Sequence, residues 1–265
     1  MKIAVIGAGN MGSAVVAGIA GSLADVEIAV SNPSVAKLDR LKNRFPSITT
    51  TASNTQACLG ASVVIMAVKP WILPGVVDEL RAVIERDMPA VVSMAGGIGL
   101  DDLERMLGDG CSPALFYVIP NTAAAVGESM TFMAQRRASG EQVSAVTRLF
   151  GACGKAVMVE ERMMNAGMVT ASCGIAFVMR YMRAMEQGAV ELGLRPGEAR
   201  QAIIQTVLGA AKLLEATGAH PEDSIDAVTT AGGLTIRGLN AMETGGMTAA
   251  VEAGMRAAMP AGRQS

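Results

Sequence analysis

The sequence predicts an α/β protein, in which an N-terminal Rossmann-type domain with a parallel sheet precedes an all-helical C-terminal dimerisation domain. Short apolar runs alternate with helix-like segments as far as about residue 135, which is typical of a parallel sheet covered by helices on both faces. A glycine-rich turn follows the first of these runs, and after Glu160 only helical spacing remains. The predicted domains are therefore 1–160 and 161–265.

Seven segments of the first domain are predicted to be strands. Several are rich in Val and Ile, as strands buried on both faces should be. The strands are expected at residues 2–6, 26–30, 62–68, 90–94, 114–119, 129–134 and 156–159. Helices are expected near residues 10–23, 34–44, 54–60, 71–86, 100–107 and 140–151.

The second domain is predicted to begin with a long helix over 162–193, which contains no proline. A helix over 196–217 follows, and another starts at Pro221 with two acidic residues in its first turn. Two more follow the glycine pairs 232–233 and 245–246. Several of these helices are apolar around most of their circumference and must be buried. We expect a second subunit to cover them, and packing against the first domain is the alternative.

Composition excludes several classes of function. The 265 residues are 51% hydrophobic, which excludes a disordered chain. The formal charge is −2 and only 3% of residues are aromatic, so the chain lacks the basic surface and stacking platforms of a nucleic-acid binder. No uninterrupted apolar run reaches the roughly 18 residues of a membrane span. Neither nucleic acid nor a membrane is expected as a partner.

Histidine and cysteine usage limits the chemistry further. Because the chain has one His, a site with several His ligands is impossible, and no metal is predicted. His220 is interpreted as a residue at a helix start; a His-based triad would have no other candidate. Four cysteines fit no zinc or redox spacing and are interpreted as small buried residues in a reducing compartment. They are Cys58, Cys111, Cys153 and Cys173.

The cytoplasm is the expected location. The first 24 residues have the Lys2 and apolar stretch of an export signal, but Asn10 and patterned glycines interrupt the stretch. We therefore interpret this segment as part of the mature protein.

The turn Gly-Ala-Gly-Asn-Met-Gly at residues 7–12 predicts a dinucleotide site, because a strand precedes it and a helix follows. Gly7 permits the tight turn, Gly9 lets the backbone approach a diphosphate, and Gly12 lets helix and strand pack closely. Asn10 and Met11 complete the helix N-terminus, where N–H groups and the helix dipole favour an anion. A chance glycine-rich turn is the alternative.

The end of the second strand favours NADP over NAD. An NAD-specific site usually places Asp or Glu about 20 residues after the glycines. Here Ser31, Asn32, Pro33 and Ser34 occupy that region, with Lys37 one turn later. No carboxylate repels a 2′-phosphate, and the donors of Ser31, Asn32 and Ser34 suit one. NAD remains possible but less favoured.

Two further strand ends are expected to face the cofactor, because ligands of open parallel sheets bind outside the carboxyl ends of strands. The first comprises Val68, Lys69 and Pro70, and the second comprises Ala95 and Gly96. Taken alone, Lys69 is equally compatible with a surface position.

The most distinctive stretch is 226–246, where hydroxyl groups and glycines gather at the mouth of a helix. Thr230, Gly232, Gly233 and Thr235 offer N–H and O–H donors that suit a carboxylate. Ordinary helix capping by Thr and Gly is the alternative.

These motifs together make the sequence resemble the pyrroline-5-carboxylate reductase family over nearly the whole chain. The matching segments are 7–12, 68–70, 93–97, 120–122, 228–236 and 242–246. Segment 228–236 is the most specific, because its glycine pair, Thr and Ile repeat the family signature with its spacing. The glycine turn by itself fits many dehydrogenases.

The resemblance implies reduction of a small cyclic imino acid, 1-pyrroline-5-carboxylate, to L-proline with NAD(P)H in the last step of proline biosynthesis. It also implies a helical domain that interleaves with its twofold mate, so we expect a homo-oligomer built from interleaved dimers. The resemblance assigns Asn54 to the cofactor and Asn121 to the substrate loop. It assigns Thr230, Gly232, Gly233, Leu234 and Thr235 to the substrate, with Thr235, the predicted catalytic residue, near the ring nitrogen.

The chain departs from the family pattern at three positions. Ala231 stands where the family commonly has Pro, so that loop is less rigid before it binds substrate. Phe177 replaces a Tyr and loses its hydroxyl, and Gly218 replaces a frequent acidic residue. None of these changes removes a donor that the chemistry clearly requires.

Two other functions stay open. One is another hydride-transferring reductase of the hydroxy-acid or imine class, but residues 167–182 contain neither the Lys nor the Asn that hydroxy-acid dehydrogenases place in the long helix. The other is a regulatory protein that binds the cofactor without turnover. The intact donors at 230–235 favour retained chemistry.

Overall fold

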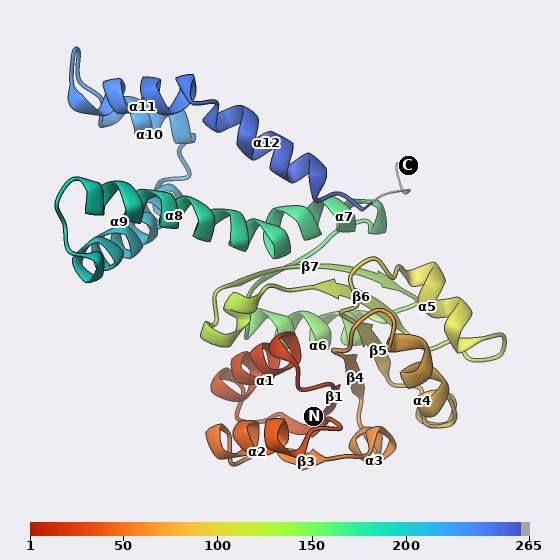
Figure 1. The fold of residues 1–265 in the computed structure, drawn as a ribbon. Coiled ribbons are helices and arrows are strands. Elements are labelled where there is room, and N and C mark those ends of the chain that lie inside the picture. The colour runs from red at the N-terminus through yellow and green to blue at the C-terminus, as the bar shows by residue number, and fades with distance from the viewer. Residues whose placement is uncertain (261–265) are drawn as a thin grey trace. The chain divides into compact units, whose positions relative to one another are not determined.

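The computed structural model describes residues 1–260, and Figure 1 labels most of its helices and strands. One compact unit comprises Met1–Cys173 together with Met259 and Pro260, and a second comprises Gly174–Ala258. The first contains an eight-stranded sheet and the second contains helices. The predicted fold class is confirmed. The boundary at residue 160 stays a prediction, and residues 261–265 of the predicted second domain lie outside the described residues.

The sheet has the strand order β3-β2-β1-β4-β5-β6-β7-β8. The strands are β1 (Lys2–Ile6), β2 (Glu27–Ser31), β3 (Thr49–Thr51), β4 (Val63–Met66), β5 (Ala90–Ser93), β6 (Leu115–Ile119), β7 (Ser129–Arg136) and β8 (Gly154–Met158). The strand order reverses at β1, between β2 and β4. A crevice at the carboxyl ends of these strands is the usual ligand position in such a sheet.

One junction of the sheet is antiparallel. Strands β1 to β6 pair in parallel, whereas β7 runs antiparallel to β6 and parallel to β8. Residues 120–128, which join β6 to β7, include only a short 3-10 helix, η1 (Thr122–Val126). A parallel crossover needs a dozen or more residues, so this connection returns the chain in the opposite direction.

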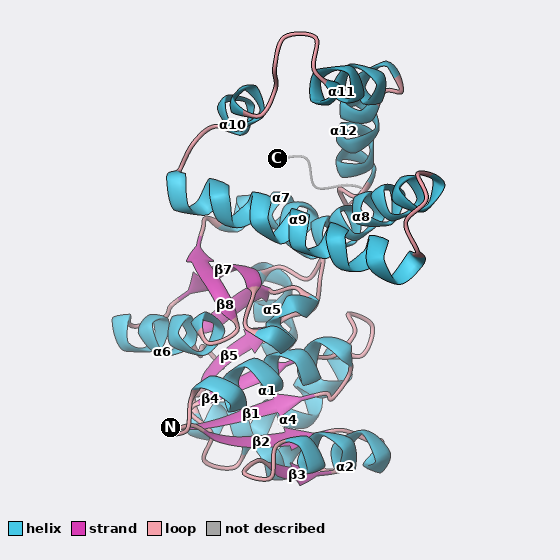
Figure 2. Ribbon diagram, turned by 90° about the vertical axis from the view of Figure 1, so that its left-hand side faces the viewer, coloured by secondary structure: helices cyan, strands magenta, loops and turns pink. Residues whose placement is uncertain are grey.

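Alternate residues of the central strands enter two separate cores; Figure 2 draws the strands in magenta and the surrounding helices in cyan. Ile3 and Val5 face the core with helices α1 (Asn10–Ser22), α2 (Val35–Arg44) and α6 (Gly140–Gly151). Ala4 and Ile6 face the core with α3 (Asn54–Cys58), α4 (Leu73–Asp87) and α5 (Leu100–Leu107). Burial of each large aliphatic side chain contributes roughly 1.5–3 kcal/mol, so both faces of the sheet are stabilised.

The predicted helix over 162–193 is irregular at its start. It consists of η2 (Glu161–Met163), α7 (Met164–Gly167), a π-helical segment η3 (Met168–Cys173) and α8 (Gly174–Glu191). A Cβ atom on Gly167 would lie 2.5 Å from the Phe132 ring, so the backbone packs directly on β7 there. This tertiary contact coincides with the change of helix type, and no spacing in the sequence marks it.

Four helices complete the second unit: α9 (Pro196–Thr217), α10 (Pro221–Ala227), α11 (Leu234–Thr244) and α12 (Met247–Ala257). Both prolines stand at the first helical position, as predicted. His220 precedes α10, and its Nδ1 accepts a hydrogen bond of 3.3 Å from the backbone N–H of Glu222. The interpretation of His220 as a helix-start residue is confirmed.

The cysteines are unpaired, and three of them are buried as predicted. Burial raises the pKa of the Cys58 and Cys153 thiols to about 12, so both stay protonated. Cys111 is buried as well, whereas Cys173 is partly exposed at the end of η3. None of the helices formed by residues 1–260 combines the length and the apolar character that a membrane crossing requires.

Candidate functional site

The glycine turn after β1 is built by close approaches that only glycine allows. Gly7 has φ +106°, and a Cβ atom on it would lie 2.7 Å from the Ala67 carbonyl oxygen. A Cβ atom on Gly12 would lie 2.0 Å from the Gly7 carbonyl oxygen. Around Gly9 there is open space. The two crowded glycines press the turn onto the sheet, while Gly9 leaves its outer side clear for a ligand.

The turn is also tied to the end of β2. The Gly7 N–H donates to the Ser31 carbonyl over 2.8 Å, and the Ala8 N–H donates to Asn32 Oδ1 over 3.1 Å. Gly9 is the N-cap of α1 and offers no side chain to the free N–H groups of the first turn. A helix N-terminus of this kind binds a phosphate group.

A cavity of about 710 Å³ opens at the carboxyl ends of β1, β2, β4 and β5. Twelve of the predicted cofactor residues line it: Gly7, Gly9, Asn10, Met11, Ser31, Asn32, Asn54, Val68, Lys69, Pro70, Ala95 and Gly96. Gly12 and Ser34 do not line it. Gly12 supports the turn from within α1, and Ser34 is the N-cap of α2 without a side-chain cap bond.

The polar groups at the end of β2 are engaged with protein. Ser31 Oγ donates to Asn54 Oδ1 over 2.7 Å, and Asn54 Nδ2 donates to Glu79 over 2.7 Å. Asn32 Nδ2 donates to the Ser34 carbonyl over 3.3 Å. Ser31 and Asn32 are both buried. These residues therefore position the loop, and their direct contact with a cofactor stays a prediction.

Asn121 lies at the start of η1, buried to 7% exposure. Its Oδ1 accepts from the Ala123 N–H over 2.9 Å, and its Nδ2 donates to the Ala171 carbonyl of η3 over 3.2 Å. The side chain thus links η1 to the π-helical segment. The neighbouring Thr122 lines the 710 Å³ cavity, so Asn121 fixes a segment of the cavity wall.

Sequence reasoning missed several lining residues. Ile72 and Val76 of the α4 region line the cavity one helical turn apart, and Thr122 lines it from η1. Glu79 holds Asn54 from α4. Helical spacing marks Ile72 and Val76 as one face, but nothing in the sequence distinguishes that face from ordinary core.

The predicted substrate residues lie in the second unit, around a tight turn before α11. The Gly233 N–H donates to the Thr230 carbonyl over 2.8 Å, and Gly232 has φ +70°. A Cβ atom on Gly233 would lie 2.4 Å from Thr230 Oγ1. The turn therefore needs both glycines, and it brings the Thr230 hydroxyl close to the N-terminus of α11.

Leu234 and Thr235 form the first turn of α11, and both are exposed. Gly233, the N-cap, again provides no side-chain acceptor. The backbone N–H groups of this turn and the two Thr hydroxyls are donors of the kind that a carboxylate accepts. The roles of Thr230, Gly232, Gly233, Leu234 and Thr235 stay predictions.

The second unit buries little of itself. Of residues 174–258, only Glu186 and Ala199 are buried. Large apolar side chains are exposed, for example Leu192 at 89% and Leu213 at 54%. A helical unit with this surface needs a partner to cover it.

Glu186 joins the two longest helices of that unit. Its carboxylate receives hydrogen bonds from Arg183 on α8 at 2.9 Å and from Arg200 on α9 at 3.0 Å. These guanidinium groups hold the pKa of Glu186 below its usual range. The carboxylate is charged at neutral pH and fastens α8 to α9.

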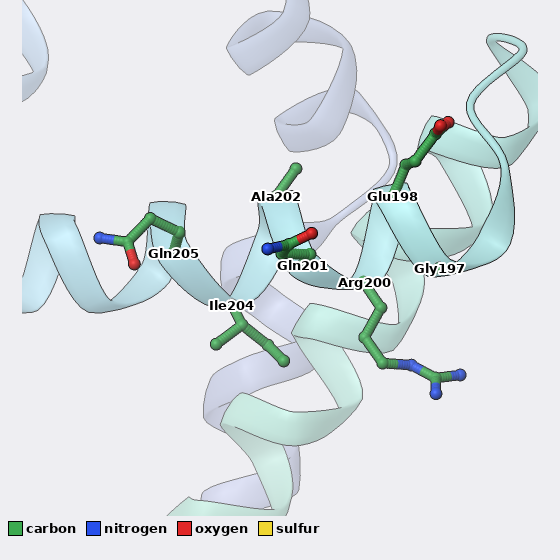
Figure 3. A pocket seen from close by; sticks show the side chains of 7 residues that line it. All are labelled: Gly197, Glu198, Arg200, Gln201, Ala202, Ile204 and Gln205. Carbon is green, nitrogen blue, oxygen red and sulfur yellow. The ribbon is translucent and has the colours of Figure 1, made fainter.

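A hollow of about 600 Å³ lies along α9, lined by residues of that helix alone. Figure 3 shows that the Glu198, Gln201 and Arg200 side chains point in different directions along the helix. None of the predicted site residues lines it. Without converging polar groups, this hollow does not form a chemical site.

Two family models match the chain. Pyrroline-5-carboxylate reductase dimerisation matches residues 161–265, and NADP oxidoreductase coenzyme F420-dependent matches residues 2–97. Among solved structures, a pyrroline-5-carboxylate reductase from Coxiella burnetii is 29% identical with a TM-score of 0.87, covering 97% of this chain and 95% of that one. A Plasmodium falciparum pyrroline carboxylate reductase with NADP bound has the same TM-score at 23% identity and therefore supports the fold alone.

Curated relatives match at nearly full length. Pyrroline-5-carboxylate reductase 3 of Danio rerio is 34% identical over 253 residues, 94% of this chain and 86% of the relative. Pyrroline-5-carboxylate reductase of Methanosarcina acetivorans is 35% identical over 252 residues, 94% of this chain and 92% of the relative. The chain belongs to the pyrroline-5-carboxylate reductase family.

Proposed function

We propose that this protein reduces 1-pyrroline-5-carboxylate to L-proline with NADPH, the last step of proline biosynthesis. The observation that carries the proposal is similarity at 34–35% identity to pyrroline-5-carboxylate reductases along 94% of the chain. The chain also has the features that each reactant requires. The first unit has a cavity for a dinucleotide, and the second has a donor-rich helix N-terminus for a carboxylate.

The residues of the first unit fit a dinucleotide phosphate. The open side of Gly9 and the uncapped N-terminus of α1 offer N–H donors to a diphosphate. No Asp or Glu lines the cavity, so no carboxylate repels a 2′-phosphate. These observations favour NADPH over NADH, with NAD as the weaker cofactor.

When bound, NADPH supplies the hydride that reduces the imine carbon of the substrate. The residues of this chain position the substrate rather than supply acid–base groups. We assign the N–H groups of Leu234 and Thr235 and the Thr230 hydroxyl to the substrate carboxylate. The Thr235 hydroxyl hydrogen-bonds the ring nitrogen and fixes which face of the ring is presented, which is a positioning effect.

The nitrogen needs one proton when the carbon receives hydride. A cyclic iminium carries that proton from water, so the chain need not deliver it. This is consistent with His220 serving as a helix cap and with buried, protonated thiols at Cys58 and Cys153.

The homodimer that the dimerisation family implies is proposed to be interleaved, with the apolar helices of the second unit buried between subunits. Free, mostly buried cysteines fit the reducing cytoplasm, which is the proposed compartment.

The test is oxidation of NADPH by purified protein, followed by loss of its near-ultraviolet absorbance. Oxidation that depends on added 1-pyrroline-5-carboxylate, with L-proline as product, is the expected result. No substrate-dependent oxidation would overturn the proposed reaction. A catalytic efficiency with NADH that equals or exceeds the value with NADPH would overturn only the cofactor preference.

A further inference from the structure

A row of basic side chains lies on one face of α2, beside the cofactor cavity. Lys37, Arg40 and Arg44 follow one another at intervals of three and four residues, which places them on the same side of a helix. They line a second cavity of about 520 Å³. The lining of this cavity contains no Asp or Glu, so its charge is wholly positive.

The two cavities share part of their wall. Gly9, Asn10, Lys37 and Thr122 line both of them. Gly9 and Asn10 begin α1 at the proposed diphosphate site. The basic face of α2 therefore flanks the place where the phosphate groups of a dinucleotide would lie.

These cations are not neutralised by protein. Within the part of the chain that the structure describes, no carboxylate forms an ion pair with Lys37, Arg40 or Arg44, whereas Arg86, for example, pairs with Asp87 at 2.6 Å. Like charges at this spacing repel one another. An anion bound among them would relieve the repulsion.

Arg40 is turned toward the start of its helix. Its Nε donates to the Ala36 carbonyl over 3.2 Å, so the guanidinium lies back along α2 toward Lys37. This bond uses Nε, and among the described residues the two outer nitrogens of the guanidinium have no hydrogen-bond acceptor. A phosphate accepts a pair of parallel N–H bonds from such a fork.

The polar groups at the end of β2 offer a 2′-phosphate no positive charge. The Ser31 hydroxyl already donates to Asn54, and the Asn32 amide bridges Ala8 and Ser34. The Ser34 hydroxyl makes no cap bond and can donate to a phosphate, but it is uncharged. Most of the positive charge that a phosphate dianion needs must therefore come from α2.

We propose that Arg40 together with Lys37 binds the 2′-phosphate of NADPH, and that Arg44 strengthens this binding through longer-range attraction. The cavity face of α2, more than the end of β2, then selects NADPH over NADH. This inference rests on the proposed function only in its choice of a dinucleotide cofactor.

Equilibrium binding of NADP⁺ and NAD⁺ to the full-length protein, measured by calorimetry without imine substrate, tests it. Arg40→Gln should raise the Kd for NADP⁺ about tenfold or more, because a charge-assisted fork is lost. The Kd for NAD⁺ should change by less than about twofold. Arg44→Gln should have a smaller effect of the same kind, and Arg40→Lys an intermediate one.

Arg86→Gln is the matched control. It removes one exposed arginine of the same unit that pairs with Asp87 and lines neither cavity, and both Kd values should stay unchanged. Equal weakening of NADP⁺ and NAD⁺ by Arg40→Gln, or no change in either, would overturn the proposal. Turnover of 1-pyrroline-5-carboxylate plays no part in this measurement. Failure of the 2′-phosphate proposal is therefore distinguished from failure of the proposed reaction.

Discussion

The glycine turn at β1 shows how the absence of two side chains shapes a phosphate site. Gly12 is buried in the first turns of α1, and a Cβ atom there would lie 2.0 Å from the Gly7 carbonyl and 3.0 Å from Ala67 Cβ. Backbone atoms cannot yield as the end of a flexible side chain can. The position of the helix N-terminus against the sheet therefore depends on a hydrogen atom at residue 12.

Gly12→Ala should displace the turn and raise the Kd for NADP⁺ by about tenfold or more, because the first N–H groups of α1 no longer converge on the diphosphate. Gly21→Ala in the same helix is the control, since a Cβ atom there meets nothing within 4 Å. It should leave the Kd unchanged and slightly stabilise α1, because Ala is a better helix former by about 1 kcal/mol. Equal Kd values for both variants would contradict this account of Gly12.

Thr235→Ala should lower kcat about tenfold or more by removing a hydrogen bond to the ring nitrogen that strengthens in the transition state. The residue is exposed in the first turn of α11, so the fold should survive. Steady-state kinetics should show kcat falling while the Kd for NADPH stays near the wild-type value. Thr235→Ser should recover most of the rate, and a Thr235→Ala kcat within about twofold of wild type would refute the role.

Residue chemistry predicts which positions gather at the cofactor cavity better than it predicts what each does. Gly7, Lys69 and Gly96 line the cavity because each follows a strand end, and strand ends are visible in the sequence. Asn32 also lines it, but its amide is occupied by Ala8 and Ser34. Which atoms a side chain contacts depends on loop geometry, and no spacing records that geometry.

Elements with a strong apolar pattern are predictable, whereas those set by tertiary contacts are not. All seven predicted strands correspond to observed strands, because each contains a Val- and Ile-rich or otherwise apolar run. The eighth strand, β3 (Thr49–Thr51), was not predicted and is a partly exposed run of three threonines at the sheet edge. Such a strand carries no buried run to reveal it. The π-helical segment η3 likewise begins directly after the packing of Gly167 on Phe132, a contact between distant parts of the sequence.

The α8–α9 pair should lose stability in acid. Arg183 and Arg200 hold the pKa of Glu186 below its unfolded value, so the stabilisation is present above the unfolded pKa of about 4.3 and is lost as pH falls through the folded pKa. At pH 7, Glu186→Gln should lower the thermal midpoint, because two arginines lose their partner. The difference from wild type should shrink below about pH 4.

Glu252→Gln provides the comparison within the same unit. Glu252 forms an exposed pair with Arg256 at 3.0 Å, and such pairs contribute little to stability. Its thermal midpoint should follow that of wild type across the pH range. If the difference in thermal midpoint between Glu186→Gln and wild type did not change with pH, the charge of Glu186 would not stabilise the fold.

At the scale of the whole molecule, burial is distributed unevenly between the two units. The first unit encloses two cores around its sheet, whereas residues 174–258 bury only Glu186 and Ala199. Exposed side chains such as Leu192 and Val228 contribute no hydrophobic stabilisation to the second unit while they are in contact with water. The low charge and the few aromatic residues of the sequence agree with helices that pack against another subunit.

If the subunits fold as a dimer, stability should depend on protein concentration. Unfolding at about 0.7 kcal/mol per residue gives roughly 370 kcal/mol for two chains, so raising the concentration from about 1 µM to about 100 µM should raise the thermal midpoint by about 3 °C. Calorimetry at the two concentrations measures the shift, with light scattering to establish the mass. A monomer that unfolds in one step would show no shift. The apolar surface of the second unit would then have to be buried within one chain.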